Sequence, residues 1–117
     1  MHREGTNPEN VQPEDILCDF CHRAVWAMGL PCIEGHHGSV ICGDCLKIAW
    51  LEIVGMDGGA GQDGRDCTMC LACHDVHVWE SPLHPESLIC RRCVKMAGVT
   101  LRRDGDYEWE TPAGPDD

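Results

Sequence analysis

The sequence predicts a small metal-bound α+β protein built from two similar lobes. Ten of its 117 residues are cysteines, and most of them fall in Cys-x-x-Cys pairs. Two dense segments of the chain also repeat one another, each with signals for short strands followed by a helix. A chain of this length buries little apolar surface, so cross-links or metal ions are expected to stabilise it.

The internal repeat is clearest at the second cysteine pair of each segment. Residues 41–49 (ICGDCLKIA) match residues 89–97 (ICRRCVKMA), with Ile, both Cys, Lys and Ala identical. Earlier in the chain, residues 18–22 (CDFCH) match residues 70–74 (CLACH), and each match is followed by a Val-Trp pair. We therefore interpret the chain as a duplication.

Composition divides the chain into five segments. The polar, proline-containing N-terminal segment is expected to be a disordered, mobile arm, and a glycine-rich segment between the repeats to be a flexible linker. The expected organisation is an arm at 1–15, metal-binding lobe 1 at 16–56, a linker at 57–66, metal-binding lobe 2 at 67–110 and a frayed tail at 111–117.

In lobe 1 the sequence predicts two short strands and a helix. The strands are expected at 25–28 and 39–41, separated by proline and glycine residues that break the chain. A helix is expected from Gly43, ending near Gly55. Apolar residues at three- and four-residue spacing give this helix one apolar face. That face consists of Leu46, Ala49, Trp50 and Ile53.

Lobe 2 is expected to follow the same order, with an additional hairpin. Strands are predicted at 76–79 and 88–89, and a shorter helix at 91–97, which Gly98 would end. The turn residues at 104–106 (DGD) then predict a C-terminal β-hairpin. Its two strands would be residues 99–103 and 107–110.

The cysteine pairs predict two structural zinc ions. Two Cys-x-x-Cys pairs can turn four sulfurs toward one ion, and a tetrahedral four-cysteine set is what zinc accepts in a structural site. Disulfides or an iron–sulfur cluster are the alternatives, because spacing alone does not exclude iron. Lobe 1 offers Cys18, Cys21, Cys42 and Cys45, and lobe 2 ends in Cys90 and Cys93.

The first pair of lobe 2 is ambiguous because Cys67, Cys70 and Cys73 are evenly spaced. We favour Cys70 with Cys73, since the following histidine then aligns with His22. The residue after such a pair often has a positive φ, which histidine tolerates better than Leu71 would. The alternative, Cys67 with Cys70, gives a spacing closer to that of lobe 1. The favoured set is Cys70, Cys73, Cys90 and Cys93, with Cys67 as the alternative to Cys73.

The remaining cysteines and histidines have no clear metal partner. Cys32, followed by His36 and His37, could form a third metal site or a redox pair, but we favour a small buried thiol and two solvated histidines. We expect His22 and His74 to lie beside the zinc-bound sulfurs. Surface positions without a partner are expected for His77 and His84.

The tryptophans are expected to fill the thin cores of the lobes, as large residues often do in small metal-bound modules. Two of them occupy equivalent strand positions, and one lies on the apolar helix face. An exposed tryptophan would instead indicate a partner surface. The four are Trp26, Trp50, Trp79 and Trp109.

Residues 18–21 (CDFC) and 40–46 (VICGDCL) resemble the N-terminal C4-type zinc-binding domain of the ClpX unfoldase. The resemblance covers 16–55 closely and 67–98 more loosely. It implies a treble-clef, zinc-ribbon-like fold in each lobe: a zinc knuckle, a β-hairpin and a helix. In that family the domain dimerises and docks substrates and adaptors, which here implies a monomeric pseudo-dimer or a homodimer. The chain has no G-x-x-x-x-G-K-[ST] phosphate loop, so the ATPase is not implied.

Interleaved metal ligands are an alternative architecture. The cysteines from Cys67 to Cys93 resemble the second half of a LIM module, and those from Cys18 to His36 resemble the start of a RING. Each pattern lacks one ligand at the expected spacing. The repeat between the two segments favours separate sites.

Charge and hydropathy exclude several classes of function. The chain has 20 acidic and 9 basic residues and a formal net charge of −11, which argues against binding along nucleic-acid phosphates. No apolar run approaches the ~18–20 residues of a membrane span. The sequence shows no secretory leader, so we expect a reducing, cytoplasmic location in which thiols bind metal.

These observations together predict a non-enzymatic protein-interaction or adaptor module with partners of basic character. A four-cysteine zinc site has no open coordination position and cannot activate water, and no catalytic motif is present. The alternative is a nucleic-acid-binding zinc-finger regulator. Its basic patch would be Arg91, Arg92 and Lys95 with Arg102 and Arg103.

Overall fold

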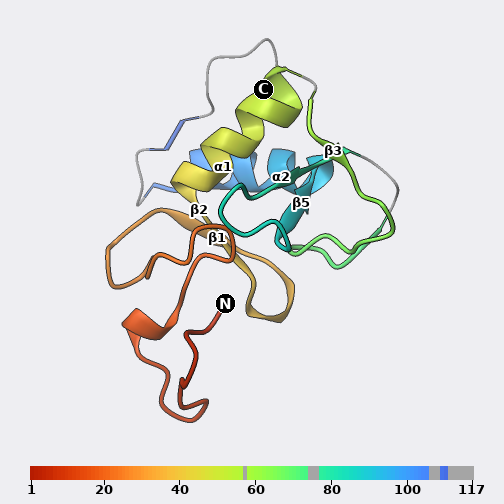
Figure 1. Ribbon diagram of the computed structural model, residues 1–117. Coiled ribbons are helices and arrows are strands. Elements are labelled where there is room, and N and C mark those ends of the chain that lie inside the picture. The colour runs from red at the N-terminus through yellow and green to blue at the C-terminus, as the bar shows by residue number, and fades with distance from the viewer. Residues whose placement is uncertain (57, 74–76, 106–108, 111–117) are drawn as a thin grey trace.

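The computed structural model is a small α+β structure that describes residues 1–56, 58–73, 77–105 and 109–110 (Figure 1). None of its helices within this part of the chain is long and apolar enough to cross a bilayer. The elements, in chain order, are η1 (Pro13–Asp15), β1 (Cys32–Glu34), η2 (His36–Gly38), β2 (Val40–Cys42), α1 (Gly43–Ala49), η3 (Trp50–Gly55), β3 (Ala60–Gly61), β4 (His77–Glu80), β5 (Leu88–Cys90) and α2 (Arg91–Arg102).

Lobe 1 is a Cys-x-x-Cys turn, a two-stranded hairpin and a helix. β1 and β2 pair antiparallel, with Cys32 opposite Cys42. Cys42 is also the N-cap of α1, where its sulfur accepts from the backbone N–H of Cys45. The helix continues as one π-helical stretch, η3, to Gly55. The predicted apolar face is confirmed, since each of its four side chains is at most 1% exposed: Leu46, Ala49, Trp50 and Ile53.

Lobe 2 follows the same order with one more strand. β4 pairs antiparallel with both β3 and β5, with Val78 opposite Cys90. Cys90 is the N-cap of α2, as Cys42 is of α1. The predicted strands at 76–79 and 88–89 are confirmed in residues 77–79 and 88–89, whereas residue 76 lies outside the described residues.

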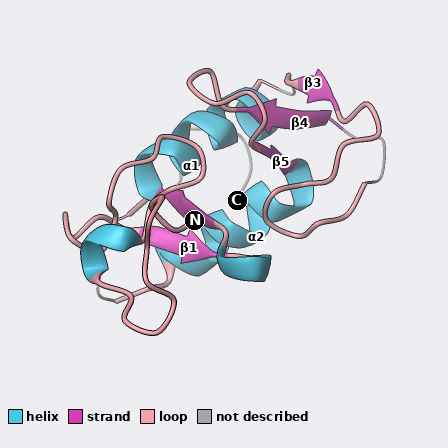
Figure 2. Cartoon of the chain, turned by 60° about the horizontal axis from the view of Figure 1, so that its bottom comes forward, coloured by secondary structure: helices cyan, strands magenta, loops and turns pink. Residues whose placement is uncertain are grey.

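The helices of the two lobes pack against each other and share one core. α2 contacts α1 and η3 as well as β1, β4 and β5, so it lies between the two small sheets (Figure 2). A close approach at Gly98 makes this packing possible, because Trp50 of lobe 1 lies directly against it. Trp109 packs on the same side and donates from Nε1 to the carbonyl oxygen of Gly43 at 2.9 Å.

The predicted C-terminal hairpin is wrong. α2 does not end at Gly98 but runs to Arg102, so residues 99–102 of the expected first strand are helical. The physical reason is tertiary, because Val94, Ala97 and Leu101 are buried on one helix face and burial outweighs the helix-breaking tendency of one glycine. Residue 106 of the expected turn and residues 107–108 of the expected second strand lie outside the described residues.

The predicted strand at 25–28 is also wrong. These residues form turns, in which the N–H of Met28 donates to the carbonyl of Ala24 at 3.0 Å and that of Leu30 to Val25 at 2.8 Å. These bonds use backbone groups that a strand would need. β1 begins only after Pro31 and Gly29, which has a φ of 65°. As a result Trp26 is 53% exposed rather than in the core, unlike the other three tryptophans.

The segments expected to be an arm and a linker both contact the lobes. His2 forms a β-bridge with Ile16, and the N-terminal amine of Met1 makes a 2.8 Å ion pair with Asp19. In the glycine-rich segment, β3 joins the sheet of lobe 2, and Gln62 is 1% exposed and donates to the carbonyl of Ala72. The expected tail at 111–117 lies outside the described residues.

We expect Gly98→Ala to destabilise the protein by up to about 2 kcal/mol in chemical unfolding. A Cβ at this position would lie 2.5 Å from Cζ3 and 2.7 Å from Cε3 of Trp50. The alanine gains about 1 kcal/mol of helix propensity, but overpacking a closed core typically costs about 1–3 kcal/mol. The control Thr100→Ala, exposed on the same helix, should change stability by less than about 0.5 kcal/mol. A stabilised Gly98→Ala protein would contradict the described helix packing.

Candidate metal centres

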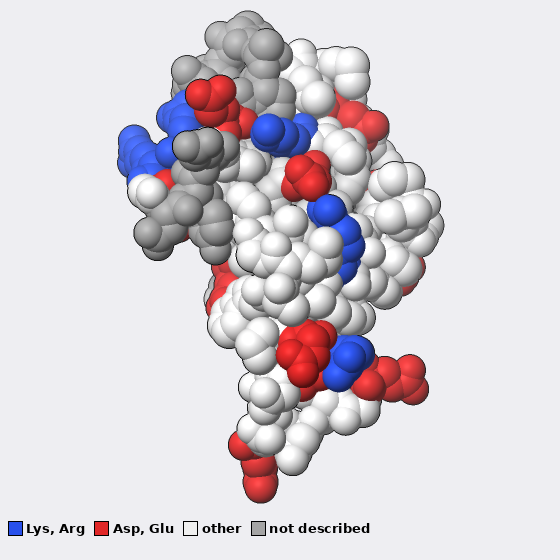
Figure 3. Space-filling view, turned by 90° about the vertical axis from the view of Figure 1, so that its left-hand side faces the viewer, with Lys and Arg blue, Asp and Glu red and all other residues white. Residues whose placement is uncertain are grey.

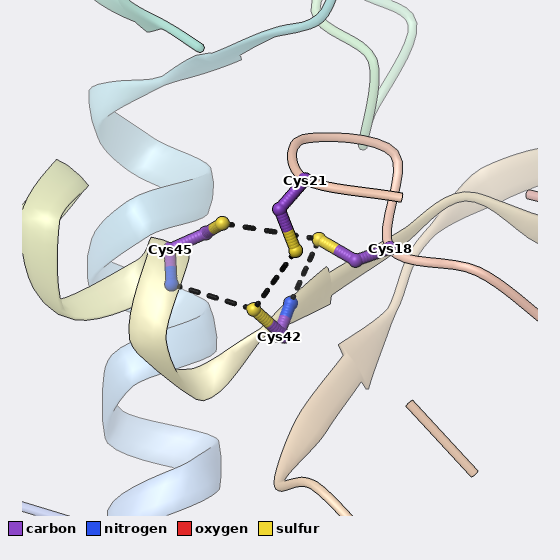
Figure 4. A group of neighbouring side chains, drawn as sticks. All are labelled: Cys18, Cys21, Cys42 and Cys45. Atoms are coloured by element: carbon purple, nitrogen blue, oxygen red, sulfur yellow. Dashed lines mark hydrogen bonds between the residues drawn. The ribbon is translucent and has the colours of Figure 1, made fainter. Parts of the chain in front are cut away.

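Four cysteine sulfurs of lobe 1 converge on one point (Figure 4). Cys18 and Cys21 come from the Cys-x-x-Cys turn, Cys42 from the junction of β2 with α1, and Cys45 from the first turn of α1. Cys18 and Cys42 are fully buried, and Cys45 is 7% exposed. The strand–helix junction therefore brings together two cysteine pairs that are far apart in the sequence, as predicted.

Lobe 2 holds a second four-cysteine cluster made of Cys67, Cys70, Cys90 and Cys93. The structure corrects the favoured assignment of Cys73, which is exposed and outside this cluster, whereas Cys67 is fully buried in it. Equivalent positions of the two repeats are thus Cys18 and Cys67.

The backbone of the turn explains why Cys67, and not Cys73, belongs to the cluster. Leu71 adopts a φ of 62°, the same value as His22 in lobe 1. Its N–H donates to the Cys67 carbonyl at 2.7 Å, just as the N–H of His22 donates to the Cys18 carbonyl at 2.7 Å. The left-handed conformation costs leucine about 1–2 kcal/mol, which is small beside the free energy of zinc binding. The metal-binding turn therefore determines the backbone conformation, and the local preference of leucine does not.

The sulfur–sulfur distances fit zinc. Cys18 and Cys45 lie 4.0 Å apart and Cys21 and Cys42 3.7 Å apart. In lobe 2 the sulfurs of Cys67 and Cys93 lie 3.8 Å apart, and those of Cys70 and Cys90 lie 3.9 Å apart. A disulfide bond is only about 2.05 Å long, whereas a tetrahedron with Zn–S bonds of about 2.3 Å places its sulfurs about 3.8 Å apart. The two clusters therefore fit two structural zinc ions.

Backbone N–H groups point at the buried sulfurs. The Cys18 sulfur accepts from the N–H of Phe20 at 3.4 Å and from that of Cys42 at 3.3 Å. In lobe 2 the N–H of Cys90 donates to the Cys67 sulfur, also at 3.3 Å. Such donors stabilise the thiolate form that binds metal. Both lobes repeat this feature because both strand–helix junctions have the same backbone.

Hydrogen bonds among the sulfurs lower the pKa of one thiol in each cluster and raise the pKa values of others. Bonds from Cys18 and Cys45 lower the pKa of Cys42 far below its usual range, while the bond with Cys42 raises the pKa of Cys18 to about 12. In lobe 2 Cys67 is the low-pKa thiol, and its bond to Cys90 raises the pKa of Cys90 to about 11. Several thiolates are thus stable together only with a cation between them. Zinc must displace protons, so its affinity falls as the pH is lowered.

Arg23 contacts the first cluster directly, a contact that was not predicted from the sequence. Its Nε donates to the Cys21 sulfur at 3.3 Å, and an Nη donates to the Cys42 sulfur at 3.2 Å and to Asp44 at 2.9 Å. The guanidinium offsets part of the charge of about −2 that four thiolates and one Zn²⁺ carry. At the equivalent position lobe 2 has Ala72, which cannot donate. The signal in the sequence was the position of Arg23, two residues after a ligand.

The remaining candidate residues lie outside both clusters. Cys32 is partly buried, and desolvation raises the pKa of its thiol although a hydrogen bond from Trp26 opposes that shift. His36 and His37 are exposed, and neither joins a metal-binding group in the described part of the chain. His22 follows the ligand Cys21 in the chain, but its ring stacks on His84, and no contact with a cluster sulfur is found among the described residues. His74 lies outside the described residues.

Comparisons with models of protein families, with curated proteins and with solved structures find no significant match to this chain. The assignment of the clusters as zinc sites therefore rests on their geometry and donor set. The resemblance to the ClpX zinc-binding domain stays a prediction.

Arg23→Ala should lower the zinc affinity of the lobe 1 site about 10- to 100-fold, because removing one outer hydrogen-bond partner of a metal ligand has effects of that size. Competition with a chromophoric chelator measures the change. Arg65→Ala is the matched control, since Arg65 pairs with Glu80 at 3.1 Å and not with a sulfur in the contacts that the structure describes. Equal zinc retention by both variants would show that Arg23 does not support the site.

Limited alkylation of the zinc-loaded protein tests the choice between Cys67 and Cys73. We expect Cys73 to react first because it is exposed, and Cys32 more slowly because burial raises its thiol pKa. The eight cluster cysteines should be protected until zinc is removed. Peptide mapping by mass spectrometry locates the label. Early labelling of Cys67 with protection of Cys73 would overturn the assignment.

Proposed function

We propose that the protein is a non-enzymatic interaction or adaptor module in which two treble-clef lobes are held by structural zinc. The observation that carries this proposal is an exposed tryptophan on a turn of the metal-binding lobe. Trp26 is 53% exposed, and Met28 beside it is 56% exposed. Large aromatic side chains are enriched among the residues that contribute most to protein–protein binding.

The tryptophans of the two Val-Trp pairs do not occupy equivalent positions. Trp79 lies on β4 opposite Ile89, whereas Trp26 lies in the turn before β1, and the β1 residue opposite Ile41 is Ile33. Trp79 is 3% exposed and packs on Phe20, with ring centroids 5.6 Å apart. Trp26 stacks on no aromatic ring among the described residues, although the preceding Val25 is fully buried and anchors the turn. A buried anchor beside an exposed aromatic ring gives a fixed apolar surface at low entropic cost on binding.

Closed zinc sites support a structural rather than a catalytic role. Each cluster supplies four thiolates, so a tetrahedral zinc ion has no open position for water or substrate. Zinc then serves to fix the turns from which exposed side chains project.

Charge favours a partner of basic character. The formal net charge is −11, and the zinc–thiolate sites add about −2 each. On the face shown in Figure 3, acidic and basic side chains lie next to one another in small groups among uncharged ones. Long-range attraction would therefore speed association with basic proteins and weaken as salt is added.

Nucleic-acid binding is the second candidate, because α2 gathers several basic residues. Arg91, Arg92, Lys95 and Arg102 all lie on this helix. The net charge of the chain opposes this function, since phosphate binding depends on an excess of positive charge.

Trp26→Ser should abolish partner capture by zinc-loaded protein while leaving two zinc ions bound. The matched control is Leu83→Ser, which removes an apolar side chain that is 67% exposed in lobe 2. Quantitative pull-down from reduced lysate identifies proteins retained by wild type and Leu83→Ser but lost from Trp26→Ser. The purified partner should then bind Trp26→Ser at least tenfold more weakly, a loss of about 1.4 kcal/mol.

Equal capture by all three baits would contradict the role of Trp26. A gel shift of DNA or RNA by the zinc-loaded wild type at low salt, lost when Arg91 and Arg92 are replaced by alanine, would favour the nucleic-acid function instead.

A further inference from the structure

Two histidines and a glutamate meet outside the cysteine clusters. His22 of lobe 1 and His84 of the loop between β4 and β5 stack with ring centroids 3.5 Å apart and an interplanar angle of 12°. Nδ1 of His84 lies 3.8 Å from Oε1 of Glu86. One potential ligand atom from each residue lies within 4.8 Å of the other two. Sequence spacing gives no hint of this group, because its members come from different lobes.

The backbone of His22 is held by the metal-binding turn. It has a φ of 62°, and its N–H donates to the carbonyl of Cys18 at 2.7 Å. Because Cys18 and Cys21 belong to the first cluster, zinc binding there fixes the position from which the His22 ring projects. The ring is therefore presented by one of the most constrained turns of the chain.

The opposite loop is attached to the same turn. Ser81 is 1% exposed, and its hydroxyl donates to the carbonyl of Phe20 while accepting from the N–H of His84 at 3.2 Å. The N–H of Ser87 closes the loop by donating to the carbonyl of His84 at 2.8 Å. Both histidine backbones are thus held at fixed separation before any ligand arrives.

We propose that His22, His84 and Glu86 form a third metal site, which takes a divalent cation of the zinc class. Two imidazoles and one carboxylate are ligands for Zn²⁺, Co²⁺ or Ni²⁺. A tetrahedral zinc ion with bonds of about 2.0–2.1 Å needs ligand atoms about 3.4 Å apart. The ligand atoms now lie up to 4.8 Å apart. An imidazole nitrogen binds a metal in the plane of its ring, so metal binding requires the two stacked rings to rotate out of their stack.

This site differs chemically from the cysteine clusters. It supplies three protein ligands, and because the side chain of Glu86 is 71% exposed, water can occupy the fourth position. The ion is therefore exchangeable, and it ties the lobe 1 turn to the β4–β5 loop of lobe 2. Binding to the folded form alone would raise stability with metal concentration.

The test starts from protein that carries two tightly bound zinc ions. Zn²⁺ is titrated in by calorimetry, and native mass spectrometry counts the ions. We expect a third zinc ion in wild type and in the control His77→Ala, whose histidine is exposed on β4. The variants His84→Ala and His22→Asn should bind it at least tenfold more weakly while keeping the first two. Asparagine is chosen at position 22 because it tolerates the left-handed backbone.

A second readout locates the ion. Substoichiometric Ni²⁺ should broaden the imidazole resonances of His22 and His84 and leave those of His36, His37 and His77 sharp. Failure of wild type to take a third ion would overturn the proposal, as would full third-site affinity in His84→Ala. Broadening confined to His36 and His37 would place the ion elsewhere and would also overturn it.

Discussion

Coordination of zinc by four thiolates is the interaction on which the rest of the structure depends. In zinc-finger peptides structural zinc contributes about 10–16 kcal/mol at pH 7, which equals or exceeds the whole stability of an ordinary domain of about 5–15 kcal/mol. Each cluster joins a turn to a strand–helix junction at least 20 residues later, 21 from Cys21 to Cys42 and 20 from Cys70 to Cys90. The left-handed φ of His22 and Leu71, the N-caps of both helices and the strand registers all follow from this geometry.

The second constraint is the close packing between the lobes. Trp50 of lobe 1 meets Gly98 and Trp109 of lobe 2 where the helices pack together, so the indole of Trp50 fills space that the absence of a side chain at Gly98 leaves. The loop after β4 adds a contact from Ser81 to the metal-binding turn of lobe 1. The lobes therefore form one core, and a surface such as that around Trp26 is held by both zinc coordination and apolar burial.

Sequence reasoning identified the features that depend on local chemistry. The repeat at 41–49 and 89–97, the helix starts at the second cysteine pairs and the apolar face of α1 all follow from spacing. It failed where contacts between residues far apart in the sequence determine the local structure. Gly98 looked like a helix end because its contact with Trp50 is not visible in the sequence. Leu71 looked unsuitable for a positive φ because only the conformational preference of leucine was considered, and the free energy of zinc binding was not. His22 and His84 lie 62 positions apart by number, so no local pattern could pair them.

X-ray absorption at the zinc edge, on protein loaded with two zinc ions per chain, tests the central claim most directly. The account predicts an average shell of four sulfur atoms at about 2.3 Å and no nitrogen or oxygen ligand. A shell that contains nitrogen or oxygen would contradict two four-cysteine sites. So would failure of the reduced protein to retain two zinc ions.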